Sequence, residues 1–217
     1  MVGDAAAGTP SDEESLMSTA RDLMIVALGL TPSRPLRRGD LSLALAGAEA
    51  YDLLRAEAIT LAGELMVPRP LPDLEDPLLE EAASALVREA PHESLEDWLW
   101  RRGRDLAAAY LTALEREGQV SWERHRWLPF RGGRGVLGDT EARRRAMYRW
   151  AADEPVLLAL AAAVGIRDEP TPAEPGVTDE AALGVLAAVH DAVMELEAVR
   201  RRRAIEEAAF ANVWRGA

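Results

Sequence analysis

Arginine side chains are concentrated in the middle of this chain. Residues 101–149 contain twelve Arg and six acidic residues, although the whole 217-residue chain carries a formal net charge of −12. The planar guanidinium group donates paired hydrogen bonds to phosphate and carboxylate groups. A basic segment within an otherwise acidic chain is typical of a docking surface for an anionic partner. The sequence therefore predicts that this segment contributes to an anion-binding surface.

One group of arginines is the first candidate for this surface. It lies near the start of an expected helix and on a later one, and its members are Arg37, Arg38, Arg101, Arg102 and Arg104. If the two helices pack side by side, these side chains can converge on a phosphate head group. The alternative is a solvated helix face on which Arg101 pairs with Asp97 or Asp105 and contributes little. The exclusive use of Arg, with no Lys, is also what a GC-rich genome produces.

A second group forms a secondary candidate patch. Its members are Arg131, Arg134, Arg143 and Arg144. The first two flank glycines in a loop that can nest an anion, although a turn that merely needs Gly explains them as well. The run Arg200 to Arg203 is denser, but four consecutive helical positions point in all directions and acidic residues lie nearby. We expect that run to be a solvated, self-paired helix.

Two tryptophans lie beside the first group of arginines. Trp98 and Trp100 are two positions apart, so they cannot both face the core from one helix, and one should be partly exposed. Trp100 either lies at a membrane interface or covers the junction with a neighbouring helix.

Patterns typical of catalysis are scarce. His92, His125 and His190 occur singly, with no metal-ligand spacing, and His190 is expected on the inward-leaning side of a helix. The chain has no Lys for a phosphate-binding loop, no Cys and no nucleophile elbow. We therefore expect no catalytic residues, no metal and no cofactor.

Composition also indicates where the protein works. Without Cys it has no disulfides, and no apolar run approaches the roughly 18 residues that span a bilayer. The apolar stretch Leu23 to Leu30 is short and follows acidic residues, unlike a signal peptide. We expect a cytoplasmic protein that can associate peripherally with the inner face of the membrane.

Helices must position these side chains. The pattern predicts a flexible leader over residues 1–15 and one mainly α-helical domain over 16–217, with a helical bundle core, surrounding amphipathic helices and one or two short β-hairpins. The expected helices are 16–29, a second one capped by Asp40 and ending near 57, one starting near Asp76, and 94–117, 139–152, 153–163 and 178–210. At the end of the chain, Phe210, Val213 and Trp214 are expected to dock against the body.

Two short segments read as hairpins. Residues 59–67 alternate around Ala62-Gly63, which is typical of a tight turn. Residues 119–130 alternate less regularly, with a turn expected near Arg124-His125-Arg126 and with Trp127-Leu128 on the returning strand. A glycine-rich loop over 131–135 should follow.

Several segments occur in the order found in one known family. They are Asp76-Pro-Leu-Leu-Glu-Glu-Ala82 after the first hairpin, Trp98 within Ser-Leu-Glu-Asp-Trp, the helix end Leu114-Glu-Arg-Glu-Gly-Gln-Val120, the Trp127-Leu-Pro-Phe130 turn and the terminal pair of helices. From about Leu16 to Trp214 the chain resembles a bacterial member of the Golgi phosphoprotein 3 family, which contains adaptors that read phosphatidylinositol 4-phosphate. The resemblance implies an all-helical fold, membrane-surface adaptor work without catalysis, and a hairpin that some members use to form oligomers.

The resemblance also implies a lipid pocket. In the family it uses a Trp and an Arg near the start of the second helix and two basic residues three apart on the later long helix. Arg37 stands near the Trp position, Ala46 at the first Arg, and Arg104 and Ala107 at the later two. Arg104 is thus the retained basic residue, and other members of the first arginine group lie close enough in sequence to rebuild the pocket.

Three functions remain open from sequence. The favoured one is a non-catalytic adaptor that binds an anionic lipid, another phosphorylated ligand or a protein partner, as a possible homo-oligomer. The second is an enzyme or accessory protein of small-molecule biosynthesis, with His190 or His125 at the wall of an apolar pocket. The third is nucleic-acid binding through a winged-helix-like segment, which the net acidity disfavours.

Overall fold

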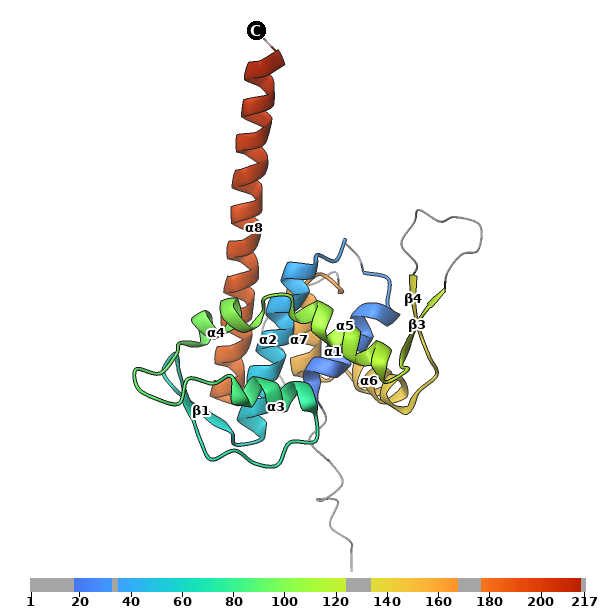
Figure 1. The fold of residues 1–217 in the computed structure, drawn as a ribbon, viewed down its shortest axis with the longest axis vertical. Helices are drawn as coiled ribbons and strands as arrows, with labels where there is room; N and C mark the ends of the chain where they lie inside the picture. The colour runs from blue at the N-terminus through green and yellow to red at the C-terminus, as the bar shows by residue number, and fades with distance from the viewer. Residues whose placement is uncertain (1–17, 33–34, 124–133, 168–176, 216–217) are drawn as a thin grey trace, which may run out of the picture.

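Helices form most of the protein, as the sequence predicts. A computed structural model describes residues 18–32, 35–123, 134–167 and 177–215, so the predicted leader over 1–15 lies outside the described residues. The elements in chain order are α1 (Thr19–Gly29), α2 (Arg38–Arg55), β1 (Ile59–Ala62), β2 (Leu65–Pro68), α3 (Pro77–Ser84), α4 (Leu95–Arg102), α5 (Leu106–Arg116), β3 (Val120–Glu123), β4 (Arg134–Leu137), α6 (Glu141–Ala151), α7 (Pro155–Ala163) and α8 (Glu180–Arg215) (Figure 1).

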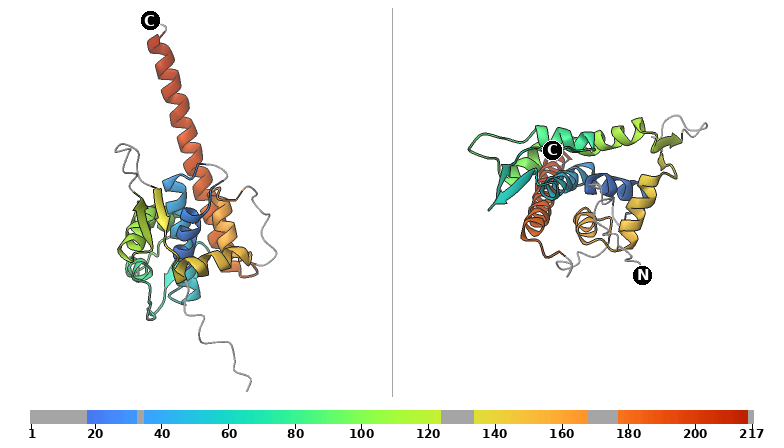
Figure 2. Two further views of the ribbon diagram at one scale, coloured as in Figure 1. Left: turned by 90° about the vertical axis from the view of Figure 1, so that its right-hand side faces the viewer. Right: turned by 90° about the horizontal axis from the view of Figure 1, so that it is seen from below.

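Helix α2 is the centre of the core. Every residue from Leu41 to Ala50 is buried, and α2 contacts α1, α4, α5, α7 and α8. The segment is rich in Leu and Ala on all sides, and a helix that is apolar all round is stable only when surrounded. In the view from below, α2 lies between α8 and α1 (Figure 2).

Gly47 allows α2 and α8 to pack closely. A methyl group built at this position would lie 2.1 Å from Val189 Cγ2, far inside van der Waals contact. Since Val189 is itself fully buried, neither helix has room to give way.

Replacing Gly47 by Ala should therefore destabilise the protein. Ala favours a helix over Gly by about 1 kcal/mol, but overpacking at a buried crossing costs roughly 1–3 kcal/mol, and the severe overlap makes overpacking dominant. We expect a net loss of about 1–2 kcal/mol in urea unfolding. Gly184→Ala is the matched control, since its methyl group would lie 3.7 Å from Leu61. Equal or higher stability of Gly47→Ala would contradict the close crossing.

The first hairpin matches its prediction and the second does not. β1 pairs with β2 so that Ala62 faces Leu65, and the turn is Gly63-Glu64, one position later than the predicted Ala62-Gly63, with Gly63 at φ +62. β3 instead pairs with β4, so the prediction that Trp127-Leu128 forms the returning strand was wrong. This register places Val120 opposite Leu137 and buries both side chains. The predicted turn at 124–126 lies outside the described residues.

The predicted helix 94–117 is two helices. α4 ends at Arg102, Gly103 packs against Ser42 and Leu43 of α2, and Asp105 has a left-handed φ of +55 before α5 begins. The Ala107 N–H donates to Ser42 Oγ at 3.1 Å, so α2 holds the break in place. The apolar repeat continues from Leu99 to Leu106, which is why sequence periodicity does not reveal the break.

Helix α8 extends well beyond the body of the protein (Figures 1 and 2). Every residue from Arg201 to Phe210 is exposed, and Phe210 itself is 68% exposed. The expectation that Phe210 docks against the body was therefore wrong; the side chains of Val213 and Trp214 lie outside the described residues. Among the described residues, no helix combines the length and apolarity needed to cross a bilayer.

Candidate functional site

A hollow of about 240 Å³ lies where the start of α2 meets the α4–α5 break. Arg38, Gly39 and Ser42 line it from α2, and Trp100 and Arg104 line it from α4 and the break. Its other lining residues are Leu43, Gly103, Asp105, Ala107, Ala108 and Leu196. We call this feature the basic hollow.

Two of the predicted arginines share the basic hollow. Arg38 and Arg104 are both exposed, and neither forms an ion pair with another described residue. Arg37 is exposed at the residue that precedes α2, next to the hollow but not lining it. Asp105 contributes one carboxylate to the lining. The guanidinium groups of Arg38 and Arg104 thus remain available to an anion.

Two helix N-termini also open into the basic hollow, a feature that sequence reasoning missed. Residues of the first turns of α2 and α5 line it. Helix α2 has no side-chain cap, whereas in α5 the Ala107 N–H donates to Ser42 Oγ and the Ala108 N–H donates to the Asp105 carbonyl oxygen. Uncapped N–H groups and the helix dipole favour an anion at such a position. The sequence signal was the absence of Ser, Thr, Asp or Asn directly before Arg38.

Asp40 does not cap α2, contrary to the prediction. The helix begins two residues earlier, and the Asp40 carboxylate instead accepts a hydrogen bond from Arg200 Nη1 of α8. Arg200 lies beside Gly39, where a methyl group would meet its Nη2 atom. This pair fixes α8 against the start of α2, next to the basic hollow.

Arg101 is held by a carboxylate away from the hollow. Its Nε and Nη2 atoms donate to the two Glu93 carboxylate oxygens at 2.6 Å, and the guanidinium lies 5.3 Å from the centre of the Trp98 ring. The hydrogen bonds to Glu93 raise the pKa of Arg101. Arg101 therefore pairs with Glu93 and not with Asp97 or Asp105, the partners considered from the sequence.

Arg102 is part of an interior ion pair. Its Nε and Nη2 atoms donate to Glu49 at 2.8 and 3.0 Å, and Nη1 donates to Glu81 at 2.7 Å. The Glu49 side chain is 0% exposed, and the Tyr110 hydroxyl also donates to it. Arg102 stabilises the core, because it pairs with two carboxylates and one of them is completely buried.

One of the two tryptophans is buried and the other is partly exposed, as predicted. Trp98 is fully buried and donates from Nε1 to the Ala46 carbonyl oxygen at 3.3 Å. Trp100 is half-buried, packs against the core and lines the basic hollow. Its indole is thus both a packing residue and a wall of the hollow.

The secondary group is spread over separate contacts. Arg131 lies outside the described residues, and Arg134 is in β4 opposite Glu123, with its side chain undescribed. Arg143 donates to the Leu137 carbonyl oxygen at 3.2 Å, and the exposed Arg144 lies 3.4 Å from Asp139.

Farther along α6, Arg149 turns inward. Its Nη1 atom donates to Asp22 at 2.6 Å, and the Asp22 side chain is completely buried. Burial raises the pKa of Asp22, although the hydrogen bond and charge of Arg149 oppose the rise.

The histidines occupy unremarkable positions. His190 is exposed on α8, so its expected inward orientation was wrong. His92 Nδ1 lies 3.3 Å from the Val87 carbonyl oxygen, and His125 lies outside the described residues. In the described ranges, no three His, Cys, Asp or Glu side chains gather as a metal site would require.

The fold and hollow define a class: a mainly α-helical domain with arginines and helix N-termini at one concave surface. The sequence model of the Golgi phosphoprotein 3 (GPP34) family matches residues 20–208, and the chain belongs to this family. The family resemblance drawn from the sequence is thereby confirmed. A search of curated proteins found no match.

Proposed function

We propose that this protein is a non-catalytic peripheral adaptor that binds an anionic ligand, a phosphorylated lipid head group, at the basic hollow. The observation that supports this most directly is the arrangement of Arg38 and Arg104 around one hollow with the uncapped N-terminus of α2. Guanidinium groups and free N–H groups at a helix N-terminus are both donors that proteins use for phosphate.

Trp100 and the overall charge add to this proposal. An indole that is half-buried beside the basic hollow suits the boundary between protein, head group and water. Because the chain as a whole carries a charge of −12, general attraction to an anionic membrane is weak, and recognition must come from a local site. We therefore expect selectivity for the phosphorylated head group over other anionic lipids at equal vesicle charge.

The small-molecule enzyme is less well supported. It requires a histidine at a cavity wall, and His190 is exposed on α8 and does not line the basic hollow. Apart from its arginines, the basic hollow has only Asp105 as a titratable group. One carboxylate without a second acid or base is a poor start for general acid–base chemistry.

Substitution of the two hollow arginines tests the proposal. Arg38→Ala and Arg104→Ala should each weaken binding to phosphatidylcholine vesicles containing phosphatidylinositol 4-phosphate by roughly tenfold, the value expected for one charge-assisted hydrogen-bonding group. Vesicle flotation measures this, with phosphatidylserine vesicles of equal charge as the comparison. Arg144→Ala, which removes an exposed arginine outside the hollow, is the control. Unchanged binding by the Arg38→Ala/Arg104→Ala double variant, or equal binding to both anionic vesicles, would reject the site.

A further inference from the structure

One face of α8 is exposed along most of the helix. Seven residues on it recur at alternating steps of four and three positions and are all exposed: Ala187, Asp191, Met194, Ala198, Arg201, Ile205 and Ala208. Ile205 is 70% exposed and Met194 is 48% exposed. This spacing is that of a seam between two paired helices, and it runs for roughly 32 Å at 1.5 Å per residue. The upper half of the seam, from Arg201 to Ala208, lies on the part of α8 that extends beyond the body (Figure 1).

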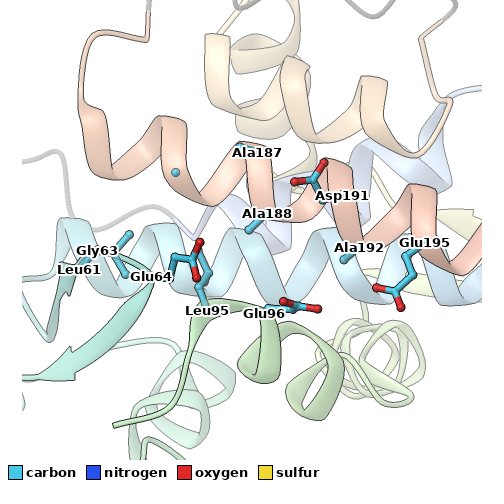
Figure 3. A pocket seen from close by; sticks show the side chains of 11 residues that line it. Leu61, Gly63, Glu64, Leu95, Glu96, Ala187, Ala188, Asp191, Ala192 and Glu195 are labelled. Carbon is cyan, nitrogen blue, oxygen red and sulfur yellow. The ribbon is translucent and has the colours of Figure 1, made fainter.

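The lower half of this face forms one wall of an acidic groove. The groove has a volume of about 350 Å³, and its other walls are Leu61 and Gly63 of the first hairpin and Leu95 at the start of α4. Four carboxylates surround it, as Figure 3 shows: Glu64, Glu96, Asp191 and Glu195. None of the four forms an ion pair with another described residue. An apolar floor with unpaired carboxylates suits an occupant that is apolar and basic.

The upper half of the same helix has that composition. It carries Arg201, Arg202 and Arg203, followed by Ile205 and Ala208. These residues project into solvent. They cannot reach the groove of their own chain, because they and the α8 wall of that groove lie on one straight helix (Figure 2). A second copy can bring its upper half to the groove if the two helices run antiparallel.

The seam is self-complementary in that arrangement. With a two-fold axis at the level of Leu196, Ala187 lies opposite Ile205 of the second copy, Asp191 opposite Arg201, and Met194 opposite Ala198. Each pair occurs twice, once on either side of the axis. A parallel pairing would place Asp191 against Asp191 and Arg201 against Arg201, which like-charge repulsion opposes.

We propose that α8 pairs antiparallel with α8 of a second copy, so that each copy's projecting half fills the acidic groove of the other. Arg201, whose Nη2 atom lies 2.6 Å from Glu197 Oε1 on its own helix, then also pairs with Asp191 across the seam, and Ile205 covers the Ala-rich floor of the groove. Glu195 lies opposite Glu197 of the second copy in this register, and the ion pair that Glu197 forms with Arg201 on its own helix reduces the repulsion. The surface is separate from the basic hollow, so the pairing does not depend on the proposed adaptor function.

A charge exchange tests the pairing. The full chain should form a dimer in light scattering, and Asp191→Arg or Arg201→Asp alone should raise the dimer dissociation constant at least about tenfold. The Asp191→Arg/Arg201→Asp double variant should restore the dimer, because the signs are exchanged on both sides. Arg88→Asp, at an exposed position away from α8, makes the same charge change as Arg201→Asp and should have no effect on the dimer. All these positions are exposed, and circular dichroism checks that the variants fold.

Introduced thiols test the direction of the helices. The chain has no Cys, so any disulfide must come from the substitutions. Ala187→Cys/Ile205→Cys should give a covalent dimer on oxidation, whereas the two positions of one chain lie roughly 27 Å apart along the helix and cannot join. Ile205→Cys alone should cross-link much less.

Several results would overturn the proposal. They are a monomer at every concentration, a dimer unaffected by both charge reversals, and equal cross-linking of the double and single cysteine variants. A monomer that binds an arginine-rich peptide at the groove would assign the groove to a basic partner and likewise exclude the pairing.

Discussion

Replacing Arg102 by Met should lower the free energy of unfolding by about 3–5 kcal/mol, the cost of leaving one member of a buried ion pair without its partner. The Glu49 carboxylate is 0% exposed and accepts two hydrogen bonds from Arg102. Without the guanidinium, the Tyr110 hydroxyl is the remaining hydrogen-bond donor to it among the described residues. Urea unfolding followed by circular dichroism measures the loss.

Two further variants show whether the buried charge is the cause. Arg101→Met removes a neighbouring guanidinium whose side chain is 42% exposed, and it should cost about 1 kcal/mol or less. Adding Glu49→Met to Arg102→Met should recover much of the lost stability, because the unpaired carboxylate is then gone. Equal costs for Arg101→Met and Arg102→Met would show that Glu49 does not depend on its partner.

The protein should lose stability as the pH rises from about 4 to about 8, and Asp52→Asn should remove much of that loss. Burial raises the pKa of Asp52 to about 7 from its usual 3.8, against hydrogen bonds from Thr19 and from the Ala20 N–H. A raised pKa means that the folded state holds the proton more tightly than the unfolded state. The resulting stabilisation is complete below the unfolded pKa and is lost as the pH passes through the folded pKa.

The expected size follows from the pKa difference. About three units at 1.36 kcal/mol each give a change of about 4 kcal/mol across this range. Urea unfolding at a series of pH values should show a flatter profile for Asp52→Asn than for the unsubstituted protein. Burial also raises the pKa of Asp22, so some loss of the same sign should remain. The exposed Asp139→Asn is the control; an identical profile for Asp52→Asn and the unsubstituted protein would refute the assignment.

The interior carboxylates explain why Arg102, one of the five arginines of the predicted site, is held in a structural contact. Arg102 neutralises Glu49, and Arg149 on α6 neutralises Asp22, each across more than fifty positions of sequence. A buried carboxylate must be paired or take up a proton, whereas the surface arginines Arg38 and Arg104 are under no such requirement. The basic segment therefore supplies both core partners and the walls of the basic hollow.

Local patterns in the sequence determined the helical class, most helix positions, the first hairpin, the family resemblance and the partial exposure of one tryptophan. Helical periodicity and the turn at Gly63 depend on residues close in sequence, so they can be read directly from it. The position of Trp100 next to an arginine-rich segment was visible for the same reason. The break between α4 and α5 was not, because Leu99 and Leu106 keep the apolar repeat while Gly103 bends the chain against α2.

Tertiary structure alone decided which guanidinium groups meet a carboxylate and which face solvent. The partners Glu49 and Glu93 were not apparent from the charge pattern, because ion pairing depends on distance in space and on burial rather than on spacing along the chain. The basic hollow likewise exists only because α2 packs against the α4–α5 break, which brings the uncapped N-terminus of α2 next to Arg104. The sequence thus specified the donors, and the packing of α2 at the centre of the bundle determined which of them remain available to a ligand.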